Sequence, residues 1–353
     1  MHSRPKIPVA VLGATGLVGQ RMIAALAGHP WFELTEVAAS DRSAGKPYAE
    51  AASWKLPGGC PLDVGELVVK RVAPDDVTAP VVLSALDASV AGEAEEAFAA
   101  AGRAVISNSR NHRMDEDVPL VVPEVNPDHL ALIEVQKRRR GGPGFIVTNP
   151  NCSTITLVMA LAPLHRVAHI KRAVVTTLQA ASGAGYPGVP ALDLIDNVIP
   201  YIGGEQDKIE VEPRKIFGTL EDGRVRFDPL AVSAQVHRVP VIDGHLVSVS
   251  LETEWLLTPD DASAILAAFT GEPQERKLPS APDPVIEVLG EKDRPQPRLD
   301  RMAGRGMAAV VGQVRPCPVL GLHLSVLGHN TIRGAAGGTL LIAELLADRG
   351  LLS

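Results

Sequence analysis

A glycine-rich segment near the start of the chain, GATGLVG at residues 13–19, separates two runs of contrasting pattern. Residues 9–12, before it, are apolar and β-rich, whereas residues 17–26 carry apolar side chains at helical spacing. Glycines at such a junction permit a tight turn and a close backbone approach to a pyrophosphate, which the N-terminus of the following helix attracts. The segment therefore predicts a dinucleotide-binding turn between a strand and a helix.

The alternation of β-rich and helical runs continues through residue 150, which is typical of a parallel sheet covered by helices. We expect strands at 9–12, 34–39, 81–86, 104–107 and 145–148, and helices at 17–26 and 91–101. The pattern predicts an α/β protein in which residues 1–150 form an N-terminal Rossmann-type dinucleotide-binding domain.

The second half of the chain has a different pattern, with long β-rich runs at 174–178, 232–241, 245–257 and 322–327 and few helical stretches between them. This predicts an α+β catalytic and dimerisation domain over 151–330, with a mostly antiparallel sheet. Residues 270–305 are rich in proline, glycine and charge, and we expect them to be loop. A helix over 332–352 would return the segment 331–353 to the first domain.

Composition excludes several classes of function. The net charge of −7 gives no basic footprint for nucleic acid, and no apolar run approaches the ~20 residues that cross a bilayer. Three widely spaced cysteines cannot form a disulfide framework or a four-cysteine zinc site, and we expect no metal. No apolar signal segment precedes the first expected strand, so we expect a cytoplasmic protein that binds neither nucleic acid nor membrane.

The end of the second expected strand bears on which dinucleotide is bound. NAD sites usually carry a carboxylate there, whereas a 2′-phosphate requires cations and hydroxyls. Here Arg42 lies between Ser40 and Ser43, with Asp41 as the dissenting residue. The segment favours NADP and leaves NAD open.

Cys152 lies among polar residues, at the point where a helix is expected to begin near Ser153. The dipole at a helix N-terminus lowers the pKa of a thiol, so Cys152 is the predicted nucleophile. Cys60 and Cys317 have no such setting. A reactive thiol needs an acid–base partner, and His245 follows a turn that begins at Arg238, so that both side chains could face one pocket.

The chain contains several motifs in a fixed order: GATGLVG at 13–19, AASDRSAGK at 38–46, SNSRNHRM at 107–114, VVPEVN at 121–126, NPNCST at 149–154, QAASGAG at 179–185, GGE at 203–205 and HNTIRGAAG at 329–337. In these motifs it resembles the aspartate-semialdehyde dehydrogenase family, in the branch found in archaea and fungi. The resemblance covers almost the whole chain.

The resemblance implies a role for each site residue. Cys152 would carry an acyl thioester, His245 would transfer the proton and Gln179 would orient the thioester. Arg238 would pair with the substrate α-carboxylate and Glu205 with its amino group. Lys208 and Arg113 would hold the phosphate, with Arg110 as a rival. Contacts with NADP would come from Gly13, Thr15, Gly16, Leu17, Val18, Gly19, Ser40, Arg42, Ser43, Ser182, Gly183 and Asn330.

The implied reaction is the NADPH-dependent reduction of L-aspartyl 4-phosphate to L-aspartate 4-semialdehyde with release of phosphate, by a homodimer or homotetramer. A malonyl-CoA-type acyl-CoA reductase on the same fold is the alternative, and a non-catalytic NADP-binding sensor is a third possibility. The family usually has Cys-Asn-Arg before the turn, whereas this chain has Val236-His237-Arg238. His237 could therefore alter carboxylate recognition or lie behind Arg238.

Overall fold

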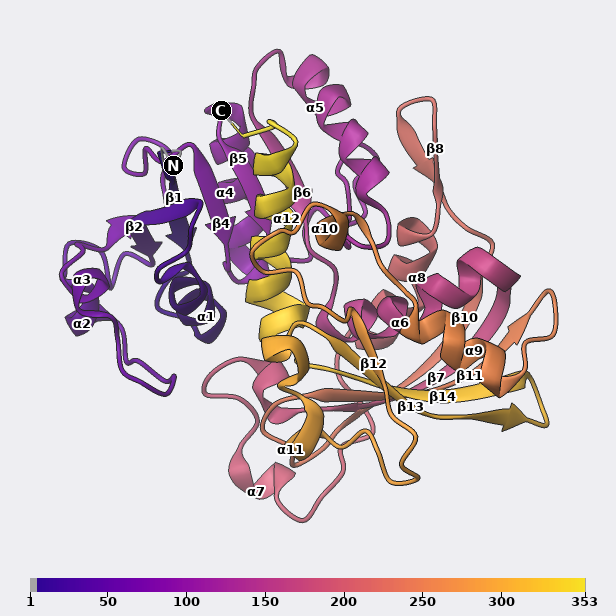
Figure 1. Cartoon of the computed structure of the whole chain (residues 1–353). Helices are drawn as coiled ribbons and strands as arrows, with labels where there is room; N and C mark the ends of the chain where they lie inside the picture. The colour runs from indigo at the N-terminus through magenta and orange to yellow at the C-terminus, as the bar shows by residue number, and fades with distance from the viewer. Residues whose placement is uncertain (1–4, 353) are drawn as a thin grey trace.

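The computed structural model describes residues 5–352, which form two six-stranded sheets with helices packed against them (Figure 1). The first sheet is parallel throughout, with the order β3-β2-β1-β4-β5-β6. Its strands are β1 (Ile7–Leu12), β2 (Phe32–Ala39), β3 (Lys70–Arg71), β4 (Val81–Ser84), β5 (Ala104–Ser107) and β6 (Phe145–Thr148). The strand order reverses between β1 and β4, and in such sheets a ligand crevice opens at this point.

The first half, within the described residues, contains five α-helices, of which the first and the fourth were expected from the sequence. They are α1 (Leu17–Leu26), α2 (Tyr48–Ala51), α3 (Leu62–Gly65), α4 (Ala88–Ala100) and α5 (Leu132–Arg140). Helix α4 begins three residues before the expected start because the side chain of Asp87 caps it, accepting a hydrogen bond of 2.9 Å from the backbone N–H of Ser89.

The second sheet has the order β10-β7-β11-β14-β13-β12. Its strands are β7 (Ile170–Gln179), β10 (Ala231–Arg238), β11 (His245–Thr253), β12 (Ile286–Val288), β13 (Ala309–Cys317) and β14 (Gly321–Gly328). The three central pairings are antiparallel, as predicted, whereas β10–β7 and β13–β12 are parallel, so the sheet is mixed. The parallel pairs join strands that are linked by long crossovers rather than by hairpins.

Two expectations for the second half are wrong. Residues 270–305 are not all loop, because they contain β12 and the short helices α10 (Glu272–Glu275) and α11 (Pro297–Asp300). The half also has more helix than expected, in α7 (Ala191–Leu194), α8 (Glu205–Ile216) and α9 (Pro259–Ala267), and a small hairpin, β8 (Thr219–Glu221) and β9 (Arg224–Arg226).

Helices α6 (Cys152–Ala168), α8 and α9 cover one face of the second sheet (Figure 1). Residues Ala173, Val175 and Gln179 of β7 point into this packed layer and are buried. Val174 and Leu178 alternate with them, lie on the opposite face and are partly exposed.

The chain ends in a π-helical turn (Ile332–Ala336) and α12 (Gly337–Asp348). Helix α12 contacts α1, and its Leu341 and Leu345 belong to the core cluster that also contains Val9 and Ile23 of the first half (Figure 1). On this packing we propose the domain limits 1–150 with 331–353, and 151–330; residues 1–4 and 353 lie outside the described part.

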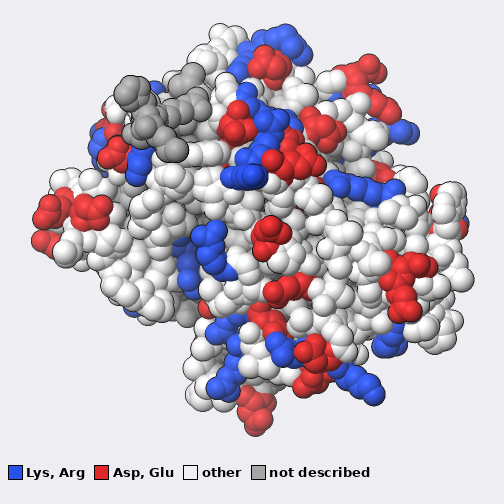
Figure 2. Space-filling view, in the orientation of Figure 1, with Lys and Arg blue, Asp and Glu red and all other residues white. Residues whose placement is uncertain are grey.

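Within residues 5–352, no helix is both long and apolar enough to span a bilayer. Figure 2 shows Lys and Arg interspersed with Asp and Glu over the face it presents, and the described residues form no extended basic patch there.

Candidate active site

Cys152 is the first residue of α6, directly after the segment that leaves the carboxyl end of β6. Asn151 caps the helix, its side-chain oxygen accepting hydrogen bonds from the backbone N–H groups of Ser153 (2.9 Å) and Thr154 (3.2 Å). Gly334 packs directly behind the nucleophile, because a Cβ at that residue would lie 2.7 Å from the Cβ of Cys152. The thiol is thus held at a helix start with backbone on one side.

His245, the first residue of β11, lies against Cys152, with 3.2 Å between Nε2 and Sγ. The other ring nitrogen, Nδ1, accepts a hydrogen bond of 3.0 Å from the backbone N–H of Ala180. Since Nδ1 is an acceptor, the proton of the neutral ring is on Nε2, and it points at the sulfur. The sequence expectation of a partnership between these two residues agrees with this geometry.

The electrostatics of the pair differ from the expectation of a thiolate. Burial, together with the nearby carboxylate of Glu205, raises the pKa of the Cys152 thiol to about 12 against the opposing effect of three cations. Burial, with the charge of Arg238, lowers the pKa of His245 to about 3. Desolvation therefore favours the neutral thiol and the neutral imidazole in the free site, against the effect of the helix end.

A cavity of about 590 Å³ opens in front of Cys152. The predicted substrate residues gather in its wall: Arg110, Arg113, Glu205, Lys208 and Arg238. Four of these five side chains are cationic, so the cavity suits a ligand with more than one negative group.

Glu205 is the centre of a hydrogen-bond network in this wall. Its two oxygens accept from the side-chain amide of Asn151 at 3.0 Å each, and Oε1 also accepts from Nζ of Lys208 at 2.6 Å. Gln179, at the end of β7, donates to Oε2 at 3.4 Å. Arg238, at the end of β10, is nearly buried and donates to the carbonyl oxygen of Ala180 at 2.7 Å. The predicted residues thus come together from three elements.

Arg113 is a second buried arginine of the site, beside Arg238. Its Nη1 donates to Glu212 at 2.9 Å and its Nη2 to the carbonyl oxygen of Asn108 at 3.0 Å. Its buried Nε–H has no hydrogen-bond partner among residues 5–352. Arg113 lines the cavity in front of Cys152, and a guanidinium in such a wall is suited to an anion.

A second cavity, of about 1080 Å³, lies over the N-terminus of α1 and the ends of β2 and β4. Gly13 has a φ of +71°, and a Cβ there would lie 2.5 Å from the carbonyl oxygen of Ala85, so only glycine fits. Helix α1 has no side-chain cap, which leaves the first N–H groups of the helix available to a bound anion.

Some of the predicted cofactor residues line this second cavity, and others do not. Its wall includes Gly13, Thr15, Gly16, Leu17, Val18 and Ser40. Gly19 packs instead against the turn, where a Cβ would lie 2.3 Å from the carbonyl oxygen of Gly13. Two further predicted cofactor residues, Arg42 and Ser43, do not line the cavity, and Arg42 is exposed.

Arg71 lines the same cavity and was missed by the sequence analysis. It lies on the two-residue strand β3, paired with Ala39, and forms a bidentate ion pair with Asp76 at 2.7 and 3.1 Å. The basic pair Lys70-Arg71 was the only signal in the sequence, because a strand of two residues is too short to be predicted from a pattern.

The remaining cofactor candidates lie near the junction of the two cavities, which share Leu86, Asp87 and Asn108 in their walls. Asn330 donates to Oγ of Ser182 at 2.8 Å. Gly183 lines the Cys152 cavity, and a Cβ there would lie 2.7 Å from Nη1 of Arg238. An elongated ligand in the larger cavity would therefore lead toward the thiol.

His237 lies on the opposite face of β10 from Arg238, since neighbouring residues of a strand alternate. Its Nδ1 is 3.3 Å from the carbonyl oxygen of Thr177, and it does not line the Cys152 cavity. The departure from the family motif thus lies behind the substrate arginine.

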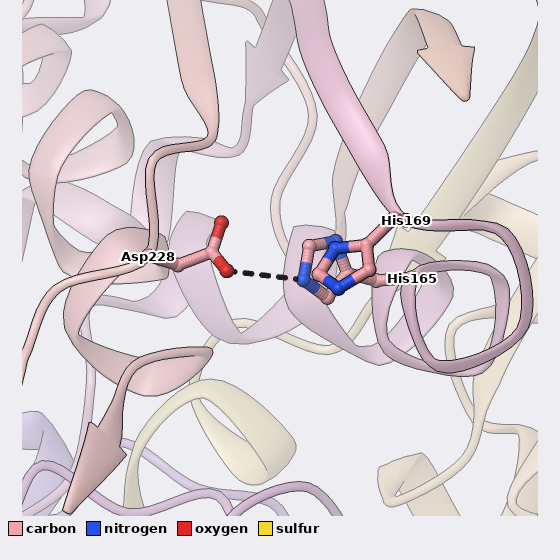
Figure 3. Close-up of side chains that lie close together, drawn as sticks. All are labelled: His165, His169 and Asp228. Carbon is pink, nitrogen blue, oxygen red and sulfur yellow. Dashed lines mark ion pairs between the residues drawn. The ribbon is translucent and has the colours of Figure 1, made fainter. Parts of the chain in front are cut away.

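One group of side chains outside the cavities has the composition of a metal site: His165, His169 and Asp228 (Figure 3). His165 accepts the backbone N–H of Ile170 on Nδ1 at 3.1 Å, so its proton is on Nε2, which faces Asp228 at 3.4 Å. A histidine that ligates through Nε2 normally donates from Nδ1, and that N–H would oppose the N–H of Ile170. The arrangement favours a histidine–carboxylate hydrogen bond over an ion.

The chain matches two family models, described as semialdehyde dehydrogenase, NAD binding domain, over residues 8–133, and semialdehyde dehydrogenase, dimerisation domain, over residues 161–333. It is 51% identical to the aspartate-semialdehyde dehydrogenase of Archaeoglobus fulgidus over 98% of this chain and 99% of that protein. The identity to the Saccharomyces cerevisiae protein of the same name is 43%, over 97% of this chain and 98% of that one.

Solved structures give the same result. The structure of the Candida albicans aspartate semialdehyde dehydrogenase with NADP superimposes with a TM-score of 0.91 at 44% identity, covering 98% of this chain and 100% of that one. The Vibrio cholerae aspartate semialdehyde dehydrogenase II, complexed with ASA, superimposes with a TM-score of 0.77 at 28% identity, covering 98% and 99% of the two chains.

Proposed function

The chain belongs to the aspartate-semialdehyde dehydrogenase family, and on that premise we propose a role for each residue of its site. The enzyme reduces L-aspartyl 4-phosphate to L-aspartate 4-semialdehyde with NADPH, a step in the biosynthesis of the aspartate family of amino acids. The observation that carries this function is the contact between Cys152 and His245, which faces a cation-lined cavity that adjoins a dinucleotide cavity.

Cys152 attacks the acyl carbon, and the carbon–sulfur bond of a thioester forms as the bond to phosphate breaks. His245 cannot take the thiol proton in this geometry, because Nε2 already carries one and Nδ1 faces the N–H of Ala180. The proton therefore leaves with the phosphate group, which balances the step. When the thioester is reduced, Nε2–H of His245 would stabilise negative charge on the substrate oxygen, and then on the sulfur as the carbon–sulfur bond breaks and the aldehyde leaves. A proton from solvent would then restore the thiol.

NADPH supplies the hydride that reduces the thioester. The chain provides a fitting place for its pyrophosphate, where the uncapped start of α1 meets the glycines of the turn. Arg71 and Ser40 in the cavity wall, with Arg42 just beyond it, would hold the 2′-phosphate. Ser182, Gly183 and Asn330 would contact the nicotinamide end.

The charged residues in front of the thiol divide the remaining tasks. Arg238 pairs with the α-carboxylate and Glu205 with the amino group of the substrate, while Gln179 orients the thioester. Lys208 and Arg113 hold the phosphate, with Arg110 at the rim. The place of Lys208, Arg113 and Arg110 in the wall of the cavity in front of Cys152 supports this assignment.

The second half matches a dimerisation domain, and the protein is an oligomer with a small-molecule substrate. We propose a homodimer or homotetramer joined through the second domain. The partly exposed side chains Val174 and Leu178 on the uncovered face of the second sheet support that location.

The function is tested with the purified protein in the oxidative direction. Aspartate semialdehyde should drive NADP reduction beyond one equivalent per site only when inorganic phosphate is present, and CoA should not replace phosphate. Malonyl-CoA reduction with no response to phosphate would show the acyl-CoA reductase alternative to be the correct one.

A further inference from the structure

Glu212, on α8, is 2% exposed and joins two separate parts of the site. Its Oε1 accepts a hydrogen bond from Nη1 of Arg113 at 2.9 Å, and its Oε2 accepts one from the backbone N–H of Asn151 at 2.8 Å. Arg113 lines the cavity in front of the thiol, and Asn151 is the cap that precedes Cys152. A single carboxylate thus connects a cavity cation with the start of the nucleophile helix.

The helix that carries Glu212 presents four charged residues toward the site, spaced three or four apart: Glu205, Lys208, Glu212 and Lys215. Glu205 holds the side chain of Asn151, while Glu212 holds its backbone. Lys215 donates to the carbonyl oxygen of Arg113 at 2.8 Å. Helix α8 therefore holds both ends of Arg113 and both ends of Asn151.

Both partners of Glu212 are donors, so the position requires two acceptor oxygens. A glutamine has one acceptor and one NH₂ group, and in either orientation that NH₂ group would face an N–H. One of the two connections must then break, although the volume of the side chain is unchanged. An aspartate keeps both acceptors and the charge with a shorter reach.

We propose that Glu212 is a positioning residue, which sets the distance between the guanidinium of Arg113 and the sulfur of Cys152 without touching the substrate. The inference rests on the proposed function in one respect, the assignment of Arg113 to phosphate. It predicts effects on two separate observables, the phosphate KM through Arg113 and the reactivity of the thiol through Asn151.

The first test compares E212Q and E212D with E210Q in the phosphate-dependent reaction. Glu210 is the matched control, because it lies on the same helix and accepts the backbone N–H of Ala234 instead. E212Q should raise the phosphate KM about tenfold, the effect of losing one charge-assisted hydrogen bond, and lower kcat. E212D should raise the phosphate KM and lower kcat by smaller factors than E212Q. E210Q should have wild-type values of both constants, and the NADP affinity should be unchanged.

A double-mutant cycle separates positioning from folding. In an R113A background, E212Q should cause no further rise in the phosphate KM, because its route to phosphate is gone. A folded E212Q enzyme with a lower Tm but a wild-type phosphate KM would overturn the proposal. If E212Q does not fold, E212D decides the same point.

Alkylation of Cys152 by iodoacetamide, followed on its peptide, tests the inference apart from the reaction. E212Q should change the rate of Cys152 alkylation, and E210Q should not. If the wild type shows no phosphate-dependent activity, the proposed function fails, whereas the alkylation result still decides the link to Cys152. An unchanged rate in E212Q overturns that link.

Discussion

The backbone N–H of Ala180 donates to Nδ1 of His245 across 3.0 Å, and this contact determines what the histidine can do. It keeps the ring proton on Nε2, which faces Cys152 at 3.2 Å, and it opposes a second proton on the ring. The histidine is therefore a donor to the sulfur and to the reacting oxygen. In the mechanism proposed above, the substrate and its phosphate activate the thiol, and no ion pair with His245 is needed.

The pH dependence of Cys152 alkylation tests this arrangement. Because burial raises the thiol pKa to about 12, the thiolate fraction of the free enzyme should keep rising with pH. The alkylation rate should increase about tenfold per pH unit from roughly pH 6 to 9, with no plateau. A plateau near neutral pH would mean a thiolate–imidazolium pair and would contradict the tautomer described above.

The same experiment contains its own control. Cys317 is a second thiol of the chain, and backbone hydrogen bonds, that of Leu320 foremost, lower its pKa. Its alkylation, measured on its own peptide, should level off at a lower pH than that of Cys152.

Arg71 should contribute to the cofactor preference. It lines the dinucleotide cavity beside Ser40, and its guanidinium can turn from Asp76 to a 2′-phosphate. R71A should weaken NADP binding about tenfold or more and leave NAD binding almost unchanged, as measured by fluorescence titration. R42A is the comparison. A larger loss of NADP affinity in R42A than in R71A would indicate that Arg42, rather than Arg71, contacts the 2′-phosphate.

The cations of the smaller cavity should separate kinetically. K208A should raise the phosphate KM roughly tenfold with a smaller effect on the semialdehyde KM, whereas R238A should do the reverse. H237N is the control for Arg238, since its side chain lies on the other face of β10 and should leave both constants within about twofold of the wild type. Equal effects of K208A and R238A on both KM values would contradict the division of roles.

Local signals predicted the first half of the fold well. Helix α1 has the expected bounds because a glycine turn and an apolar stripe lie side by side in the sequence. Helix α8 was missed because its buried positions include Glu205, Glu212 and Lys215, so no apolar periodicity reveals it. Strand β12 is a three-residue edge strand among prolines, too short for a pattern.

The structure brings together most of the site residues that the sequence singled out, whereas the electrostatics of the pair Cys152 and His245 depend on the fold. Cys152 and His245 stand out by their neighbours in the sequence, but they are 93 positions apart, and only the fold brings them together. The helix start at Cys152 is visible in the sequence, whereas the burial that raises the thiol pKa depends on residues such as Gly334 from the far end of the chain. The roles proposed for Glu212 and Arg71 likewise depend on contacts that only the fold creates.

In the proposed reaction Cys152 carries the acyl group, and in the oxidative direction phosphate releases it. The most direct measurement is mass spectrometry of the enzyme after incubation with aspartate semialdehyde and NADP in the absence of phosphate. We predict a mass increase of one aspartyl group on the peptide that contains Cys152, lost on addition of phosphate and absent in C152A. An adduct on Cys60 or Cys317, or none on any peptide while NADP is reduced, would contradict the account.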